Sequence, residues 1–345
     1  MTDSNTDDSN ATTEDDPQPT EAESQPTIAV TGAAGYIGSR VVWHLREAHP
    51  DWEIVALDNF YLGTVRSVRG VDVEHVDIRN RDRLEDALSG ADVVLHLAAI
   101  SGVDDCEDNQ DLAYDVNVTG TSNVAWFCRK TGAALAFPFS MAVLGDPAKF
   151  PITADLPRDP LNWYGRTKVL GEDVVEEMAD GAFPAHTFLK SNLYGEHEIN
   201  GTHVSKGTVI NFFVDRALSG ETLTVYEPGT QSRNFIHVDD VARAYVDSTE
   251  QLLADLEANK TGVTAYEIAS DEDPSVTEVA EIVQRLTSEV ASEDVDIELR
   301  ENPRSGETLV DEFGVDTSRT EAELGWSPEH TVEESIRSLL EANQP

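Results

Sequence analysis

The chain has 345 residues, and its 66 acidic residues outnumber 24 basic ones to give a net charge of −42. Such an excess of negative charge argues against binding to nucleic acid or to anionic membranes, because their phosphates attract Lys and Arg. No apolar run approaches the roughly 18 residues that span a bilayer, and the acidic, polar start does not resemble a signal peptide. We therefore expect a soluble, cytoplasmic protein.

The basic residues are mostly arginines, with only six lysines. Abundant Asp and Glu with few Lys is a composition found in proteins from high-salt cytoplasm, where cations screen the self-repulsion. The sequence therefore predicts a halophilic protein. Cys106 and Cys128 are the only cysteines, and neither has a second Cys or His at metal-ligand spacing, so no metal site is expected.

The length favours more than one compact unit. Residues 1–26 are acidic and polar, and we expect a disordered tail there. Residues 27–190 alternate short strands with helices, which predicts an α/β domain with a doubly wound parallel sheet of the Rossmann type. Residues 191–345 are expected to form mainly a smaller α/β lobe, with the segment of about 235–260 returning to the first domain.

The expected elements follow from apolar periodicity along the chain. Strands are expected at 28–31, 53–57, 71–75, 92–96, 133–137 and 185–189, and helices at 36–48, 81–88, up to about 130, and after Tyr164. Further along, helices are expected near 209–218 and 238–252, a strand at 266–268, and two more helices after it. The sequence places that last strand in the smaller lobe.

Three glycines lie between the first expected strand and the first expected helix. Gly32 permits a tight turn, Gly35 lets the backbone approach a pyrophosphate, and Gly38 allows close packing of helix on strand. The free N–H groups of the helix N-terminus would bind the phosphates. This arrangement predicts a dinucleotide site, in the strand–turn–helix context that it requires.

The residue after the second strand indicates which dinucleotide binds. Asp58 follows Gly38 by 20 residues, where a carboxylate accepts hydrogen bonds from the adenosine ribose and repels a 2′-phosphate. Asn59 and Phe60 come next, so no Arg is present to accept that phosphate. The sequence therefore predicts NAD in preference to NADP.

Ser140, Tyr164 and Lys168 have the chemistry of a hydride-transfer site. Tyr164 and Lys168 are four residues apart on one helix face. We expect the ammonium to lower the phenol pKa towards neutrality, which would make Tyr164 a base for a sugar hydroxyl. Ser140 follows the fifth strand, at the sheet edge where such folds bind ligands.

With these motifs, the chain resembles the extended short-chain dehydrogenase/reductase superfamily, in its branch of NAD-dependent nucleotide-sugar epimerases and dehydratases. The resemblance covers about residues 27–340. It implies that Ser140, Tyr164 and Lys168 are catalytic. The cofactor-binding residues that it implies are Gly32, Gly35, Tyr36, Ile37, Gly38, Asp58, Asn59, Asp77, Ile78, Leu97, Ala98, Ala99, Asn117, Tyr164 and Lys168.

The resemblance also implies how a nucleotide-diphosphate sugar is held. Asn192, in Asn-Leu-Tyr-Gly, matches a residue that contacts substrate, as does Ser140. Arg233 and Arg304 match arginines that grip the diphosphate, for which the planar guanidinium is well suited. The family further implies a homodimer packed through the helices near 107–130 and 162–179.

The residues after Ser140 help to choose among the family's reactions. Dehydratases and decarboxylases of the branch carry an extra acid or base there, where this chain has Met141 and Ala142. We therefore expect a UDP-glucose/UDP-galactose-type 4-epimerase that works through a 4-keto intermediate with tightly bound NAD. The alternatives are a nucleotide-sugar or secondary-alcohol dehydrogenase or reductase, a 4,6-dehydratase, and an NAD-sensing protein without catalysis.

Three positions depart from the family pattern. Phe139 stands where epimerases often carry Ser, Leu144 where Tyr is common, and Leu189 where Arg is usual. Because all three are expected beside the sugar pocket, they bear on which sugar is bound.

Overall fold

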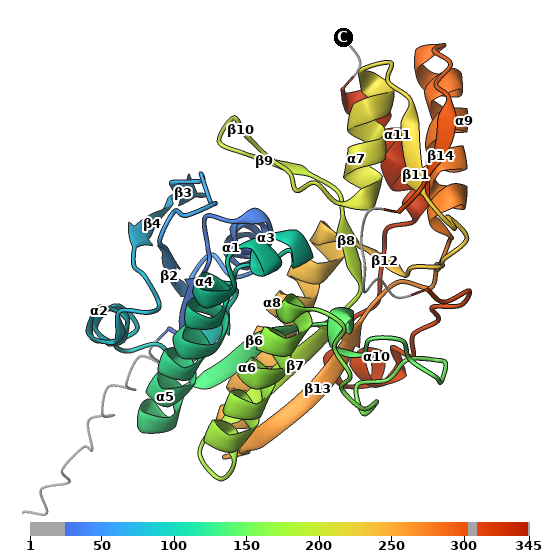
Figure 1. Cartoon of the computed structure of the whole chain (residues 1–345). Helices are drawn as coiled ribbons and strands as arrows, with labels where there is room; N and C mark the ends of the chain where they lie inside the picture. The colour runs from blue at the N-terminus through green and yellow to red at the C-terminus, as the bar shows by residue number, and fades with distance from the viewer. Residues whose placement is uncertain (1–24, 303–308, 344–345) are drawn as a thin grey trace, which may run out of the picture.

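The computed structural model describes residues 25–302 and 309–343, so most of the expected acidic tail lies outside the described residues. Its main feature is an eight-stranded sheet in the order β13-β7-β6-β5-β1-β2-β4-β3 (Figure 1). Neighbouring strands are parallel except for the antiparallel pair β3 and β4. The expected doubly wound α/β fold is confirmed.

The large sheet is built from strands distributed over most of the chain. They are β1 (Thr27–Thr31), β2 (Glu53–Asp58), β3 (Ser67–Val68), β4 (Val71–His75), β5 (Val93–His96), β6 (Ala134–Ser140), β7 (Pro184–Lys190) and β13 (Gly262–Ile268). Their crossover helices are α1 (Tyr36–Ala48), α2 (Arg81–Ala87), α5 (Thr121–Thr131), α6 (Trp163–Ala179) and α8 (Val238–Glu257).

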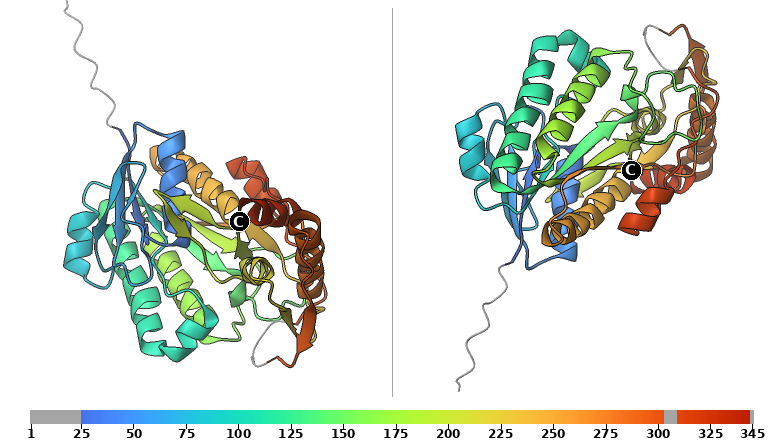
Figure 2. Two further views of the ribbon diagram at one scale, coloured as in Figure 1. Left: turned by 90° about the horizontal axis from the view of Figure 1, so that it is seen from above. Right: turned by 90° about the horizontal axis from the view of Figure 1, so that it is seen from below.

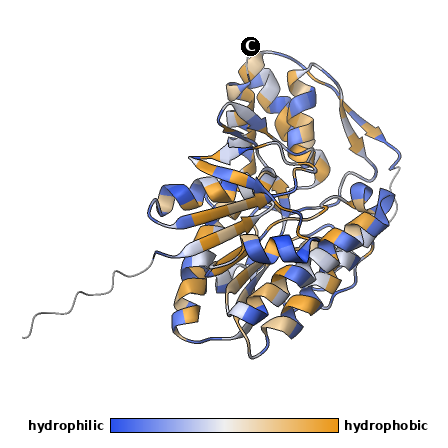
Figure 3. Ribbon diagram, turned by 90° about the vertical axis from the view of Figure 1, so that its left-hand side faces the viewer, coloured by the Kyte–Doolittle hydropathy of each residue, from blue (hydrophilic) through white to orange (hydrophobic). Residues whose placement is uncertain are grey.

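Helices cover both faces of the sheet, and each face has its own apolar core (Figure 2). On one face, α1 packs beside α8, and on the other α5 packs beside α6. The helices show apolar and hydrophilic residues side by side along their length (Figure 3), as expected of helices with one face on a core. Since parallel strands all end at one edge, the loops after β1, β2, β5, β6 and β7 gather there.

The helix expected to run to about residue 130 is not continuous. It consists of α3 (Val103–Asp108), α4 (Gln110–Tyr114), a π-helical turn (Asp115–Gly120) and α5. The turn ends at Gly120, where an added Cβ would lie 2.4 Å from Ile78 Cδ1. Close packing of this turn against Ile78 therefore requires a residue without a side chain.

Residues after β7 form a smaller layer of short strands and helices. Its strands are β8 (Asn192–Tyr194), β9 (His197–Ile199), β10 (Thr202–Val204), β11 (Leu223–Tyr226), β12 (Phe235–His237) and β14 (Ile297–Arg300). The pairs are β8 with β12, β9 with β10, and β11 with β14. Helices α7 (Val209–Leu218), α9 (Val276–Ala291) and α11 (Val332–Ala342) share a third apolar core, and α10 (Ser318–Leu324) packs on β13 and α8.

One expected strand lies elsewhere than predicted. The segment expected at 266–268 in the smaller lobe is the end of β13, which extends the large sheet beside β7. Its register pairs Gly262 with Pro184 and Ile268 with Lys190. Strand β13 is therefore the edge strand of the large sheet on the side of β7. Among the described residues no helix is long and apolar enough to cross a membrane.

Candidate active site

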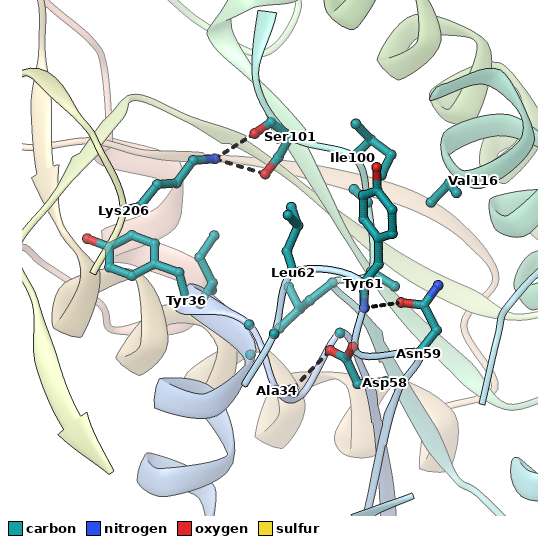
Figure 4. A pocket seen from close by; sticks show the side chains of 18 of the residues that line it. Ala34, Tyr36, Asp58, Asn59, Tyr61, Leu62, Ile100, Ser101, Val116 and Lys206 are labelled. Atoms are coloured by element: carbon teal, nitrogen blue, oxygen red, sulfur yellow. Dashed lines mark hydrogen bonds between the residues drawn. The ribbon is translucent and has the colours of Figure 1, made fainter. Parts of the chain in front are cut away.

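A cavity of about 540 Å³ opens at the edge where the parallel strands end (Figure 4). Its walls come from the loops after β1, β2, β4 and β5, from α6, from the end of β7, and from the segment around β10. The cavity therefore lies at the reversal of strand order between β1 and β5, where open α/β sheets bind their ligands.

The turn after β1 can be built only from glycine at two positions. Gly32 has a φ of +73°, and a Cβ on it would lie 2.6 Å from the backbone N of Ala98. A Cβ on Gly38 would lie 2.1 Å from the backbone O of Gly32. A Cβ on Gly35 would lie 3.3 Å from Gly32 O, which is a tight contact. The turn thus brings bare backbone to the cavity wall.

The N-terminus of α1 meets the same wall and has no side chain of its own as a cap. Gly35 is the N-cap, with no side-chain hydrogen bond to the first turn and no acidic residue within it. Gly35, Tyr36, Ile37 and Gly38 all line the cavity. Uncapped N–H groups and the positive end of the helix dipole suit an anionic group such as a diphosphate.

Asp58 ends β2 with its carboxylate on the cavity wall. Its Oδ2 accepts a hydrogen bond from Ala34 N at 3.0 Å, and its Oδ1 accepts one from Phe60 N at 2.6 Å. Burial raises the pKa of this carboxyl, against the opposing effect of those two hydrogen bonds. The backbone holds the side chain in place, and each oxygen keeps a lone pair for a ribose hydroxyl. These features fit the adenosine half of NAD.

The other residues expected to bind the cofactor fall into two groups. Ile78, Asn59, Leu97, Ala98 and Ala99 line the cavity. Asp77 does not, because its carboxylate pairs with Arg79 at 2.6 Å, and the hydrogen bonds from Arg79 lower its pKa.

Asn117 is buried and also lies outside the cavity lining. Its Oδ1 accepts from Ile100 N at 2.9 Å, and its Nδ2 donates to Ile100 O and to Thr167 Oγ1, each at 3.0 Å. In this structure Asn117 therefore ties the loop after β5 to α6, and it affects the cavity by positioning those elements.

Of the three residues expected to be catalytic, Tyr164 lines the cavity, and Ser140 and Lys168 lie behind it. Ser140 ends β6, and Tyr164 lies in the first turn of α6, which Asn162 caps by accepting from Gly165 N. Ser140 lies close enough to Tyr164 for its hydroxyl to lower the pKa of the phenol. Lys168, one turn further along α6, is buried, and its Nζ donates to Pro138 O at 3.4 Å.

The expected effect of Lys168 on Tyr164 is wrong for this structure. Burial raises the pKa of the Tyr164 phenol to about 12, although the Ser140 hydrogen bond opposes that rise. Burial also lowers the pKa of Lys168 to about 8. The Lys168 ammonium lies over the Phe137 ring and at the Pro138 carbonyl, so it is engaged away from the phenol, and desolvation dominates.

The residues expected to bind substrate lie beyond Ser140, outside the cavity lining. Asn192 begins β8, is exposed, and donates through Nδ2 to Asn234 O at 3.1 Å. Arg233, just before β12, donates to Ser232 O at 2.7 Å. The parallel pairing of β8 with β12 brings these two segments side by side. Arg304 lies outside the described residues.

Several cavity residues were not anticipated from the sequence. Tyr61 and Leu62 are exposed and reach into the cavity from the loop after β2 (Figure 4). Lys206 donates to the O and the Oγ of Ser101, each at 2.8 Å, and so links the segment after β10 to the loop after β5. Lys190 ends β7 and lines the cavity beside Tyr164. Lys190 could have been suspected from the sequence, because a lysine at the end of a strand of buried residues is unusual.

One cluster has the composition of a metal site, contrary to the expectation from the cysteines. Within the described residues, His237, Asp239 and His330 place possible ligand atoms within 4.8 Å of one another. However, Arg40 forms a bidentate ion pair with Asp239, and His330 Nδ1 bonds to Asp240 at 3.0 Å. These contacts already engage both Asp239 oxygens and His330 Nδ1, and they join α1, α8 and the segment before α11.

Comparisons with known proteins agree with this geometry. Residues 28–259 match the profile of the NAD dependent epimerase/dehydratase family. A protein of Methanocaldococcus jannaschii, provisionally named a UDP-glucose 4-epimerase, is 30% identical over 319 residues, covering 91% of this chain and 97% of its own length. UDP-glucuronic acid decarboxylase 3 of Arabidopsis thaliana is 26% identical over 331 residues, covering 91% of this chain and 88% of its own.

Solved structures share the fold. The crystal structure of UDP-glucose 4-epimerase from Thermus thermophilus, in complex with NAD, matches with a TM-score of 0.75 and 24% identity, covering 91% of this chain and 97% of that one. At this identity the match establishes the architecture, including the large parallel sheet and the smaller layer beside it.

Proposed function

The chain belongs to the NAD dependent epimerase/dehydratase family, and from this premise we propose that it is a nucleotide-sugar 4-epimerase of the UDP-glucose/UDP-galactose type. The observation that carries the proposal is the meeting of Ser140 and Tyr164 at one end of a cavity whose other end fits a dinucleotide. Residues 27–190 would form the NAD-binding domain, joined by about 235–260. Residues 191–345 would mainly bind substrate.

The residues that would hold NAD are those of the turn and of β2. The backbone of Gly32, Gly35 and Gly38 and the uncapped end of α1 would bind its diphosphate, and Asp58 its ribose hydroxyls. When bound there, NAD would take a hydride from the sugar and return it.

The chain's own residues would manage the proton and the position of the sugar. Ser140 and Tyr164 would bind the C4 hydroxyl between them, and Tyr164 would remove its proton as C4 is oxidised to a ketone. A phenol with a pKa of about 12 needs a nearby cation to act as a base. Lys168, one turn away on α6, can provide it by exchanging the Pro138 carbonyl for the phenolate.

Epimerisation further requires the ketone to be presented on its other face. Arg233 and Arg304 would hold the diphosphate while the sugar rotates, and Asn192 would contact the sugar. The proton on Tyr164 would then return to the C4 oxygen, so protons and electrons balance with no net oxidation. Elimination is disfavoured, because Met141 and Ala142 beside Ser140 have no group that moves a proton.

We also propose the setting in which the enzyme works. The net charge of −42 supports a high-salt environment, and the two buried, unpaired cysteines support a reducing, cytoplasmic compartment. A homodimer is supported by exposed apolar side chains on neighbouring helices, namely Tyr114 on α4, Trp126 on α5 and Leu170 on α6. Light scattering in high salt tests the dimer.

One assay tests the reaction. Purified protein in molar KCl, without added NAD, is incubated with UDP-glucose or UDP-galactose, and the sugar composition and the NADH absorbance are followed. Interconversion with no net NADH supports the epimerase. Stoichiometric NADH would indicate a dehydrogenase with the same three residues. If neither interconversion nor NADH formation occurs with any nucleotide sugar of a panel, both the epimerase and the dehydrogenase are excluded.

A further inference from the structure

Lys190 occupies a position next to the proposed reacting group. It is the last residue of β7, and its register partner on β6 is Ser140. Its side chain is only 8% exposed, and it lines the same cavity as Tyr164. The proposed mechanism uses Ser140 and Tyr164 but leaves the ammonium between these strands without a role.

The charge on Lys190 has no counter-charge among the residues that the structure describes. Within residues 25–302 and 309–343, no hydrogen bond or ion pair engages its ammonium. Burial lowers the pKa of Lys190 to about 7, and the positive charges of Lys168 and Lys206 add to this effect. By contrast, the exposed Lys260 pairs with Asp255 at 2.8 Å.

This concentration of lysine is unexpected in so acidic a chain. Two of its six lysines, Lys190 and Lys206, line one cavity, and a third, Lys168, is close enough to act on the charge of Lys190. Burying an unpaired ammonium is strongly unfavourable unless an anion joins it. An anionic ligand therefore fits this end of the cavity better than a neutral one does.

The other anions of the reaction have places elsewhere. The NAD diphosphate fits the N-terminus of α1, at the glycine turn. The substrate diphosphate is assigned to the arginines of the smaller layer. What remains beside Ser140 and Tyr164 is the sugar ring, with C4 at the hydroxyls and C6 two carbons away.

We propose that Lys190 binds a carboxylate at C6 of the sugar, so that the preferred substrates are nucleotide-linked uronic acids of the glucuronate and galacturonate type. This inference rests on the proposed 4-epimerase chemistry, and it shifts the preferred substrates from the neutral hexoses to the corresponding uronates. Lys190 and the carboxylate would form a buried ion pair, to which Lys168 and Lys206 add positive potential. A hydroxymethyl group at C6 would leave the ammonium unpaired.

Binding measurements separate this inference from the reaction. Protein loaded with NAD, in molar KCl, is titrated calorimetrically with UDP-glucuronate and with UDP-glucose. We expect UDP-glucuronate to bind on the order of 10- to 100-fold more tightly, the range for a hydrogen bond to a charged group. Lys190→Met should abolish that preference, chiefly by weakening the binding of UDP-glucuronate.

Two further variants control for folding and for general charge. Lys190→Arg keeps the positive charge and should keep a preference for the uronate. Lys149→Met removes an exposed lysine and should change neither affinity. Equal affinities in the wild type, or a preference that survives Lys190→Met, would overturn the carboxylate site. Loss of NAD from Lys190→Met with no change in selectivity would overturn it too, by assigning Lys190 to the cofactor.

Turnover then distinguishes the two proposals. Conversion of UDP-glucuronate to UDP-galacturonate supports both. Release of CO₂ from the uronate, with dependence on Lys190, would support the carboxylate site and contradict the epimerase. Epimerisation of UDP-glucose with no preference for the uronate would support the epimerase and contradict the carboxylate site.

Discussion

The two ends of the cavity recognise their ligands by different means. At the Asp58 end, the backbone makes the site: glycines leave the main chain bare, and the carboxylate already accepts two backbone hydrogen bonds. At the Lys190 end, side chains make the site, and the charges of Lys168 and Lys206 act on the buried Lys190. The first end is complete in the protein alone, whereas the second is complete only with an anion. We therefore expect substitutions to weaken cofactor binding at one end and to change chemistry and selectivity at the other.

The largest effect is expected at the reacting end. Tyr164→Phe removes the hydroxyl that would carry the proton, so turnover of a nucleotide sugar should fall by about 10²- to 10⁴-fold. NAD should remain bound in about the wild-type amount, as measured by its release on denaturation. Retained turnover would contradict the assignment of Tyr164 as the base.

At the cofactor end, Gly38→Ala should have the next largest effect. The new Cβ would lie 2.1 Å from Gly32 O. Because Gly32 O is a backbone atom and cannot rotate away, the turn must shift. Most of the bound NAD should be lost. The matched control is Gly314→Ala, where an added Cβ meets nothing within 4 Å, and NAD content there should be normal.

Asp58→Asn tests the same end with a smaller change. The amide cannot accept from both Ala34 N and Phe60 N, and it offers weaker acceptors to the ribose. We expect NAD affinity to fall by about 1–3 kcal/mol, or roughly 5- to 150-fold. Titration of the apoprotein with NAD and NADP measures it, and the discrimination against NADP should narrow. An unchanged ratio would contradict the role of the carboxylate.

The lysine end should also affect stability as a function of pH. Lys168 and Lys190 have folded pKa values of about 8 and about 7, below the ordinary value of 10.5. Between about pH 7 and 10.5 the unfolded chain therefore binds more protons, so stability without substrate should rise with pH. In chemical denaturation at several pH values, Lys190→Met should show a smaller rise than wild type. If stability rose with pH as steeply in the variant as in the wild type, folding would not lower the pKa of Lys190.

The smallest and most general effect concerns salt. Because the described surface and the whole chain are strongly acidic, added KCl should raise the melting temperature by screening repulsion. The Arg40–Asp239 pair is partly buried, with side chains 15% and 20% exposed, and should be less sensitive to salt. A melting temperature that falls steadily with KCl would contradict the halophilic assignment.

The cofactor end of the cavity was predicted from the sequence more completely than the lysine end. The glycine turn, Asp58 and α1 could be read in advance, because their roles depend on local backbone geometry and on short spacings. Strand β13 was misplaced because its partner β7 lies far away in sequence and no local pattern names the neighbour. Pairs such as β8 with β12 were missed because each strand has only three residues.

The proximity of Ser140, Tyr164 and Lys168 could be predicted from the sequence, but their electrostatics could not. The spacing of Tyr164 and Lys168 predicts one helix face, yet it cannot show that Lys168 turns to the Pro138 carbonyl. Lys190 was missed because the strand was expected to end at Leu189, and its burial depends on β6 and β13 on either side. Such burial is a property of the assembled sheet.

The central claim is that a hydride leaves C4 of the sugar and returns to it within one active site. UDP-glucose carrying deuterium at C4 tests this directly, with the product examined by mass spectrometry and NMR in the presence of added free NAD. The account predicts UDP-galactose with the deuterium still on C4 and none in the free cofactor pool. Loss of the label to water or its appearance in free NADH would contradict it.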